Sequence, residues 1–147
     1  MNDPLRPFDT DHVKHSIGGF TGHALRRATH MVMAIIPLIY YARGVEISEY
    51  LGMNPHQLVS SIIITLIVIE ALRIKMGIVV IGQREYEAKQ ISALAWGGFA
   101  VALALLIAPD NGKTGLESGL YGIPLIFGLT FVDPIMGEIK RKKLSLI

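Results

Sequence analysis

The sequence predicts an all-α integral membrane protein, a polytopic bundle of about four transmembrane helices with both termini in the cytoplasm. The chain has 147 residues, of which 51% are hydrophobic and 18% charged, and its mean hydropathy is +0.46. An average globular protein carries about a quarter charged residues. The charges of this chain fall in short blocks between long apolar runs, and the basic residues are concentrated in alternate blocks.

The apolar runs are the predicted membrane spans. They are His30–Tyr41, Gln57–Ile69, Ile91–Pro109 and Leu120–Ile135. A spanning helix needs about 20 mainly apolar residues, so the shorter runs must extend into flanking turns, as in Leu25–Tyr41 or His56–Leu72. The segments Ile62–Ile69 and Ala100–Ile107 have no polar face, whereas the alternative of a soluble bundle would require one.

The distribution of basic residues predicts the topology. Twelve of the 14 lysines and arginines precede the first run, separate the second from the third, or follow the fourth; Arg43 and Lys113 are the exceptions. The positive-inside rule therefore places both termini in the cytoplasm. Residues 1–24 form a polar N-terminal segment, 25–139 the transmembrane domain and 140–147 a basic tail. The absence of cysteine excludes a disulfide scaffold, a thiolate zinc site and a cysteine nucleophile.

Two charged clusters lie where predicted spans meet the cytoplasm. Arg26 and Arg27 stand four and three residues before His30, so part of this cluster shares one helix face. These side chains either anchor the helix end among lipid headgroups or bind phosphate, whose oxygens suit the planar guanidinium. Glu70 and Arg73 are spaced i, i+3. One interpretation is an ion pair at a helix end. The other is a functional site, because burying a carboxylate at membrane depth costs free energy and such residues usually have a function.

The loop between the second and third runs is also charged. Arg84 with Glu87, and Glu85 with Lys89, have the spacing of ion pairs on a helix surface. These pairs predict an exposed helical turn.

The last cluster begins at Asp133, which is followed by Pro134. Asp and Pro are typical N-cap and first-turn residues, so a helix is predicted to begin or restart here. Asp133, Gly137, Lys140 and Arg141 then share one face. That face offers a carboxylate for magnesium and two cations for phosphate. The alternative is a helix break followed by a basic stop-transfer tail.

The order of these motifs resembles the dolichol kinase and phytol kinase family, of which the chain would be a short or divergent member. The motifs are Leu25-Arg26-Arg27-x-x-His30, Glu70-x-x-Arg73 and Asp133-Pro134-x-x-Gly137. The resemblance implies an integral membrane enzyme that transfers the γ-phosphoryl group, usually from CTP, to the terminal hydroxyl of a long isoprenoid alcohol. It also implies a divalent metal such as Mg²⁺.

The resemblance also implies roles for the clustered residues. Asp133 is assigned to catalysis and to the metal, and Glu70 or His30 to orienting or deprotonating the alcohol. The residues assigned to the nucleotide and its phosphates are Arg26, Arg27, Arg73, Gly137, Lys140 and Arg141. The isoprenoid tail is expected between helices, where glycines permit a crevice. These glycines are Gly97, Gly98, Gly122 and Gly128.

Two other functions remain open. One is a non-catalytic membrane subunit or scaffold whose basic rim binds anionic lipid; the other is a CTP-using phospholipid cytidylyltransferase. Expected partners are a polyprenol or similar alcohol, membrane lipids and further copies of the chain, but no nucleic acid. A homo-oligomer is expected because a chain with four spans has too few cytoplasmic side chains to surround both a triphosphate and an alcohol. The pairs Gly18-x-x-x-Gly22 and Gly115-x-x-x-Gly119 are the predicted contact points between copies.

Overall fold

The computed structural model describes residues 17–144, except the side chains of residues 133–134, 137–138 and 140–144. The described residues fold into five α-helices and two short 3₁₀ helices, which confirms the all-α class. In chain order they are α1 (Gly19–Val32), α2 (Ile35–Tyr50), α3 (Pro55–Met76), η1 (Glu85–Lys89), α4 (Ala93–Ile107), η2 (Gly115–Gly119) and α5 (Gly122–Leu144).

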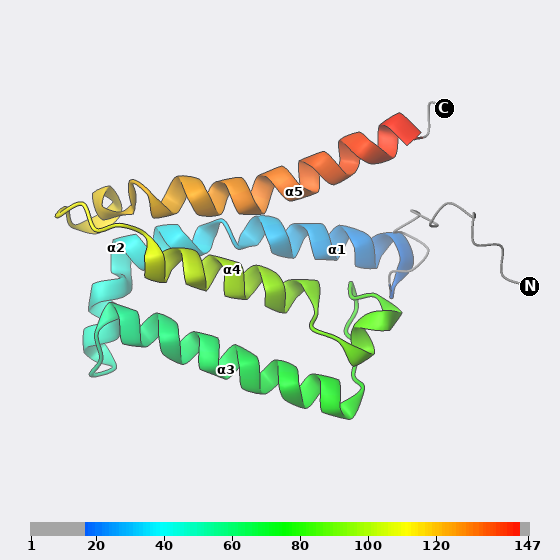
Figure 1. Ribbon diagram of the computed structural model, residues 1–147, viewed down its shortest axis with the longest axis horizontal. Helices are drawn as coiled ribbons and strands as arrows, with labels where there is room; N and C mark the ends of the chain where they lie inside the picture. The colour runs from blue at the N-terminus through cyan, green and yellow to red at the C-terminus, as the bar shows by residue number, and fades with distance from the viewer. Residues whose placement is uncertain (1–16, 145–147) are drawn as a thin grey trace, which may run out of the picture.

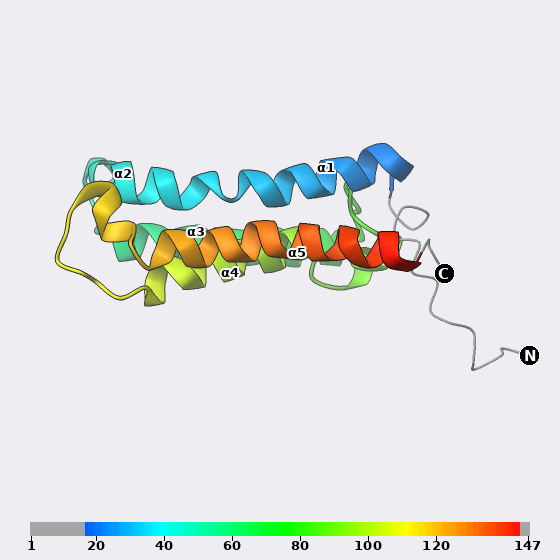
Figure 2. The ribbon, with the colours of Figure 1, turned by 90° about the horizontal axis from the view of Figure 1, so that it is seen from above.

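The helices form an elongated bundle in which the chain reverses direction after α2, after α3 and after α4 (Figures 1 and 2). α1 and α2 follow one another along one side of the bundle (Figure 2), and the second part of α2 turns toward the start of α3 (Figure 1). α1 packs against α4 and α5, and α3 packs against α2 and α4. The start of α1, the η1 loop and the end of α5 lie at the same end of the bundle, called here the η1 end (Figure 1). The η2 loop lies at the opposite end.

The first predicted span is longer than expected and is interrupted. Helix starts at Gly19, six residues before Leu25, and breaks at Met33 and Ala34. Pro37 explains the break, because proline has no N–H to donate to the carbonyl four residues earlier. The Met33 carbonyl instead accepts from the Ile36 N–H at 3.1 Å.

Two helical segments are long and apolar enough to cross a membrane. They are Gly19–Tyr50, with 32 residues, and Pro55–Met76, with 22 residues. Only 28% and 17% of their most apolar windows are buried, so neither resembles the core helix of a soluble protein. Large apolar side chains of α3, such as Ile64 and Ile69, are exposed. Helix α4 and the stretch Gly122–Val132 of α5 are shorter apolar helices.

The predicted helix start at Asp133 is wrong. α5 runs without a break from Gly122 to Leu144 and passes through Asp133 and Pro134. A proline inside a helix leaves the carbonyl four residues earlier, here that of Thr130, without its usual donor. The apolar residues before Asp133 continue the helix into the basic tail, and this longer segment outweighs the local capping preference.

Three of the four glycines predicted to join separate copies lie close to other parts of the same chain, whereas Gly115 is exposed with no atom within 4 Å of an added Cβ. A Cβ atom on Gly18 would lie 3.2 Å from the Ile81 side chain, and one on Gly82 would lie 3.0 Å from the Gly22 carbonyl oxygen. The backbone of the η1 loop therefore lies directly against α1. At the opposite end, a Cβ atom on Gly119 would overlap the ring of Tyr41.

Gly82→Ala is expected to lower the free energy of unfolding by about 2–3 kcal/mol. Gly82 has a φ of +92°, which costs an L-residue about 1–2 kcal/mol, and the added Cβ would also press on the Gly22 carbonyl. Gly52→Ala is the matched control, since its φ is +70° and no atom lies within 4 Å of the added Cβ. Thermal unfolding of the detergent-solubilised variants measures the difference. Equal losses would show that the close contact is unimportant.

Candidate functional site

A buried ion pair at the η1 end lies between the end of α3 and the start of α4. The Arg73 Nε and Nη2 atoms donate to the two carboxylate oxygens of Glu70 at 2.9 and 2.8 Å. The other donors of Arg73 reach backbone carbonyls of Ile78, Glu87 and Gln90 at 2.7–2.8 Å. All five N–H donors of the guanidinium are thereby used. The predicted Glu70–Arg73 pair is confirmed, and its arginine keeps no donor for a phosphate.

Glu70 is equally committed. Besides Arg73, its Oε1 accepts from the backbone N–H of Ser92 at 2.5 Å. Ser92 is buried and caps α4, because its hydroxyl oxygen accepts from the Ala95 N–H at 3.1 Å. The carboxylate therefore links the end of α3 to the start of α4. This geometry gives Glu70 a structural task and leaves it outside the cavities described below.

Glu87 is the residue that sequence reasoning missed. It is only 2% exposed, whereas its spacing from Arg84 predicted a surface pair. Its Oε1 accepts from Arg26 Nη1 at 2.5 Å, and its Oε2 accepts from the backbone N–H of Ala93 at 3.1 Å. Arg84 contributes its backbone N–H, at 3.3 Å, rather than its guanidinium. Glu87 therefore connects α1, η1 and α4.

The two predicted charged clusters meet through this residue. Arg26 bonds to the Glu87 carboxylate, and Arg73 bonds to the Glu87 carbonyl. Sixty-one residues separate Arg26 from Glu87, so no local pattern could reveal their contact. One feature of the sequence could have indicated this pairing. A glutamate next to long apolar segments, if it is buried, needs a positively charged partner.

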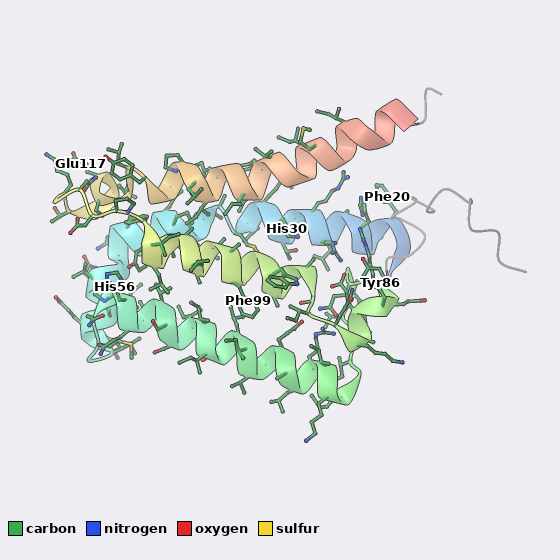
Figure 3. All side chains as sticks on the ribbon, in the orientation of Figure 1. Phe20, His30, His56, Tyr86, Phe99 and Glu117 are labelled. Carbon is green, nitrogen blue, oxygen red and sulfur yellow. The ribbon has the colours of Figure 1, made fainter. Side chains whose placement is uncertain are left out.

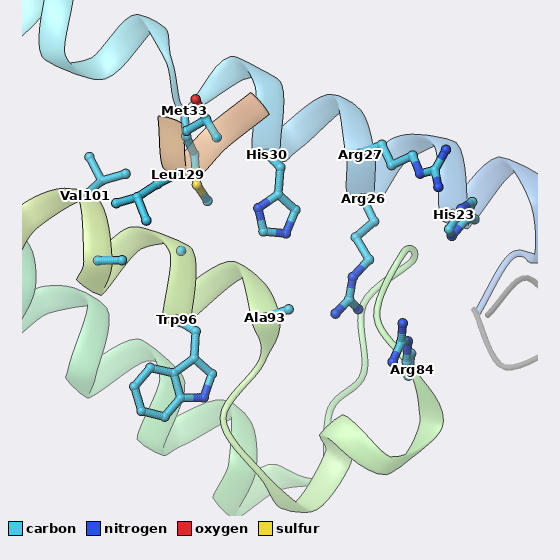
Figure 4. Close-up of a pocket in the computed structure, with 13 residues that line it drawn as sticks. His23, Arg26, Arg27, His30, Met33, Arg84, Ala93, Trp96, Val101 and Leu129 are labelled. Carbon is cyan, nitrogen blue, oxygen red and sulfur yellow. The ribbon is translucent and has the colours of Figure 1, made fainter. Parts of the chain in front are cut away.

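A cavity of about 720 Å³, the basic cavity, lies between α1, α4 and α5 (Figure 4). Nitrogen-bearing side chains gather toward the η1 end, and apolar ones toward the middle of the bundle. The first group is His23, Arg26, Arg27 and Arg84, with His30 between the groups; the second includes Met33, Gly97, Ala100, Val101 and Leu129. The sequence predicted the cluster of Arg26, Arg27 and His30 but not the places of His23 and Arg84. The apolar wall combines residues of α4 and α5 with Met33, between α1 and α2.

A second cavity of about 590 Å³, the η1 cavity, lies between the end of α3, η1 and the start of α4. Its walls include Tyr86, Lys89, Gln90 and Trp96. Arg26, Ala93 and Trp96 line both cavities, so the two are neighbours.

The predicted metal site lies outside this description. Asp133, Gly137, Lys140 and Arg141 belong to the helical backbone of α5, and their side chains are outside the described set. The C-terminal end of α5 lies at the η1 end of the bundle (Figure 1). Among the described residues, no group of three His, Asp or Glu side chains could hold a metal ion. Comparisons with protein-family models, curated proteins and solved structures find no match to this chain.

Proposed function

We propose that this protein is a membrane-bound lipid kinase that transfers a phosphoryl group, from CTP or a related nucleoside triphosphate, to a long-chain isoprenoid alcohol. The observation that carries the proposal is the basic cavity, which joins a cationic end to an apolar interior. Such a cavity suits an amphiphile whose reacting hydroxyl lies beside phosphates while its chain lies among helices. Its volume is within the range of about 300–1,000 Å³ typical of small-molecule sites.

The cations of the basic cavity support the proposal. The transition state is loose, so catalysis depends mainly on positioning and on neutralising negative charge. Arg26 and Arg27 are assigned to the phosphates, and His30 to orienting or deprotonating the alcohol. His30 is favoured over Glu70 because His30 lines the basic cavity and Glu70 does not.

The proposal keeps Mg²⁺, Lys140 and Arg141 as parts of the site. Asp133 would hold the metal together with the triphosphate, since Mg²⁺ is usually bound by one or two carboxylates and substrate phosphates. When bound, the metal would neutralise phosphate charge. Among the described carboxylates, Glu70 and Glu87 are already bonded to arginines, so they are poorly suited to replace Asp133.

The proposed membrane arrangement has four spans and a cytoplasmic η1 end. The two long segments supply two spans, and α4 and α5 supply the shorter ones. A 15-residue helix such as α4 is about 22 Å long. This is less than the roughly 30 Å of a bilayer core, so flanking residues or local thinning must make up the difference.

The direct test is transfer of labelled γ-phosphate from CTP to a polyprenol by the purified protein in detergent. We expect labelled polyprenyl phosphate, and we expect Asp133→Asn to abolish it while the protein stays folded. Asp110→Asn is the matched control, because Asp110 is exposed in the loop at the opposite end. Normal transfer by Asp133→Asn would contradict the assignment of Asp133. Absence of transfer by the unmodified protein would contradict the kinase proposal.

A second candidate is a non-catalytic subunit or scaffold that binds anionic lipid. It is favoured by the structural use of Arg73, whose five donors are all occupied. Binding of anionic vesicles without any transfer would support it. A cytidylyltransferase would instead release pyrophosphate and form a CDP-lipid. A homo-oligomer remains part of the proposal.

A further inference from the structure

The η1 cavity has a different chemistry from the basic cavity. Tyr86, Gln90 and Lys89 line it together with Trp96, which the two cavities share. Ile74, Ile91 and Glu87, whose carboxylate is bonded to Arg26, complete the wall. Aromatic rings stack on nucleobases, amides can bond base edges, and lysine neutralises phosphate. The basic cavity instead ends in aliphatic side chains, which suit a hydrocarbon chain.

The two cavities meet at Arg26 and Trp96. Arg26 lines both, and its guanidinium is held in place because Nη1 donates to Glu87 Oε1 at 2.5 Å and to the Gly82 carbonyl at 3.4 Å. Its Nε and Nη2 atoms make no bond to the described residues. Trp96 is 61% exposed, so part of its side chain is accessible to a ligand.

We infer that the η1 cavity binds the nucleoside part of the phosphoryl donor, with the base stacked on Trp96 and the phosphates extending past Arg26 toward the basic cavity. This inference rests on the proposed kinase function and divides its site into a donor cavity and an acceptor cavity. Glu87 is a positioning residue that holds Arg26 at the junction.

The arrangement defines the transfer step. The hydroxyl oxygen of the alcohol, in the basic cavity, attacks the γ-phosphorus, and the bond from that phosphorus to the β–γ bridging oxygen breaks. The hydroxyl proton passes to His30 or to water. The nucleoside diphosphate leaves through the η1 cavity, and the lipid phosphate remains beside Arg27.

The competing explanation of Trp96 is an interfacial anchor. Exposed tryptophan is common where helices meet lipid headgroups, and Phe20, which is 72% exposed, lies at the same end of the bundle (Figure 3). If Trp96 is an anchor in contact with lipid, its fluorescence should change with lipid composition. If Trp96 stacks on a nucleobase, its fluorescence should change when a nucleotide is added.

Trp96 is the only tryptophan of the chain, so its fluorescence reports directly on this site. We expect CTP and CDP to quench the emission saturably in detergent, and inorganic triphosphate to leave it unchanged. We expect Trp96→Leu to weaken binding of labelled CTP roughly 10–100-fold, as loss of one base stack does, and Trp96→Phe to retain most of it. Phe20→Leu, the matched control, should bind CTP normally.

The outcomes separate the two proposals. Quenching by CTP without transfer to a polyprenol would contradict the kinase proposal and leave the nucleotide site in place. Transfer with no quenching, and with Trp96→Leu as active as the unmodified protein, would overturn the donor cavity alone. Emission that changes with vesicles containing phosphatidylglycerol but not with CTP would identify Trp96 as an anchor and also overturn it.

Discussion

Arg73→Ala is expected to lower the free energy of unfolding by about 3–5 kcal/mol, the usual cost of removing one partner of a buried ion pair. The variant would leave the Glu70 carboxylate buried without its cation and three backbone carbonyls without a donor. The link between the end of α3 and η1 would therefore be lost. Thermal unfolding of the detergent-solubilised protein measures the effect.

The chain contains a matched control for this prediction. Arg43 and Glu46 have the same i, i+3 separation as Glu70 and Arg73, but both side chains are 66% exposed, against 8% for Arg73 and 10% for Glu70. Arg43→Ala should change stability by no more than about 1 kcal/mol. Adding Glu70→Ala to Arg73→Ala should restore part of the loss, because no unpaired charge then stays buried. Equal effects of the two arginine variants would refute the structural role of Arg73.

The sequence predicted the contact of Arg73 with Glu70, which lies on the same helix, but not the contacts of Arg73 with distant carbonyls. The i, i+3 spacing indicated that Glu70 and Arg73 would pair, since neighbouring turns of one helix bring such residues together. It carried no information on the carbonyls of Glu87 and Gln90, which reach Arg73 only after the chain has turned back along η1. Glu87 was misread because three-residue spacing favours a local partner, whereas its bonded cation, Arg26, lies on another helix.

The positions of the helices were predicted better than the positions of their ends. All-round apolarity predicted helical runs within Pro55–Met76 and Ala93–Ile107, where the whole segment carries the signal. Single residues were less reliable guides to helix ends. Pro37 interrupts the first segment, while Pro134 lies within α5, because the effect of a proline depends on how strongly the flanking turns are held. The cavities were not predictable, since their walls combine three or more segments.

Arg26→Lys is expected to lower kcat for phosphoryl transfer by about 10²-fold, the usual cost of losing one donor to developing negative charge. Lysine can keep a cation beside Glu87, so the melting temperature should change by only a few degrees. It cannot also present a second edge to a phosphate, because the ammonium lacks the planar fork of arginine. The KM for CTP should change less than kcat, since binding of the base depends on Trp96.

Arg43→Lys makes the same substitution at the exposed pair with Glu46 and should leave kcat unchanged. The comparison of kcat with stability separates a role in transfer from a role in folding. If Arg26 only fastened η1 to α1, the lysine variant would lose activity in proportion to its loss of folded protein. A folded Arg26→Lys protein with normal kcat would remove Arg26 from the reaction centre. A folded variant with reduced kcat and nearly normal nucleotide quenching of Trp96 would place the defect at the junction of the two cavities, where the phosphoryl group is proposed to pass.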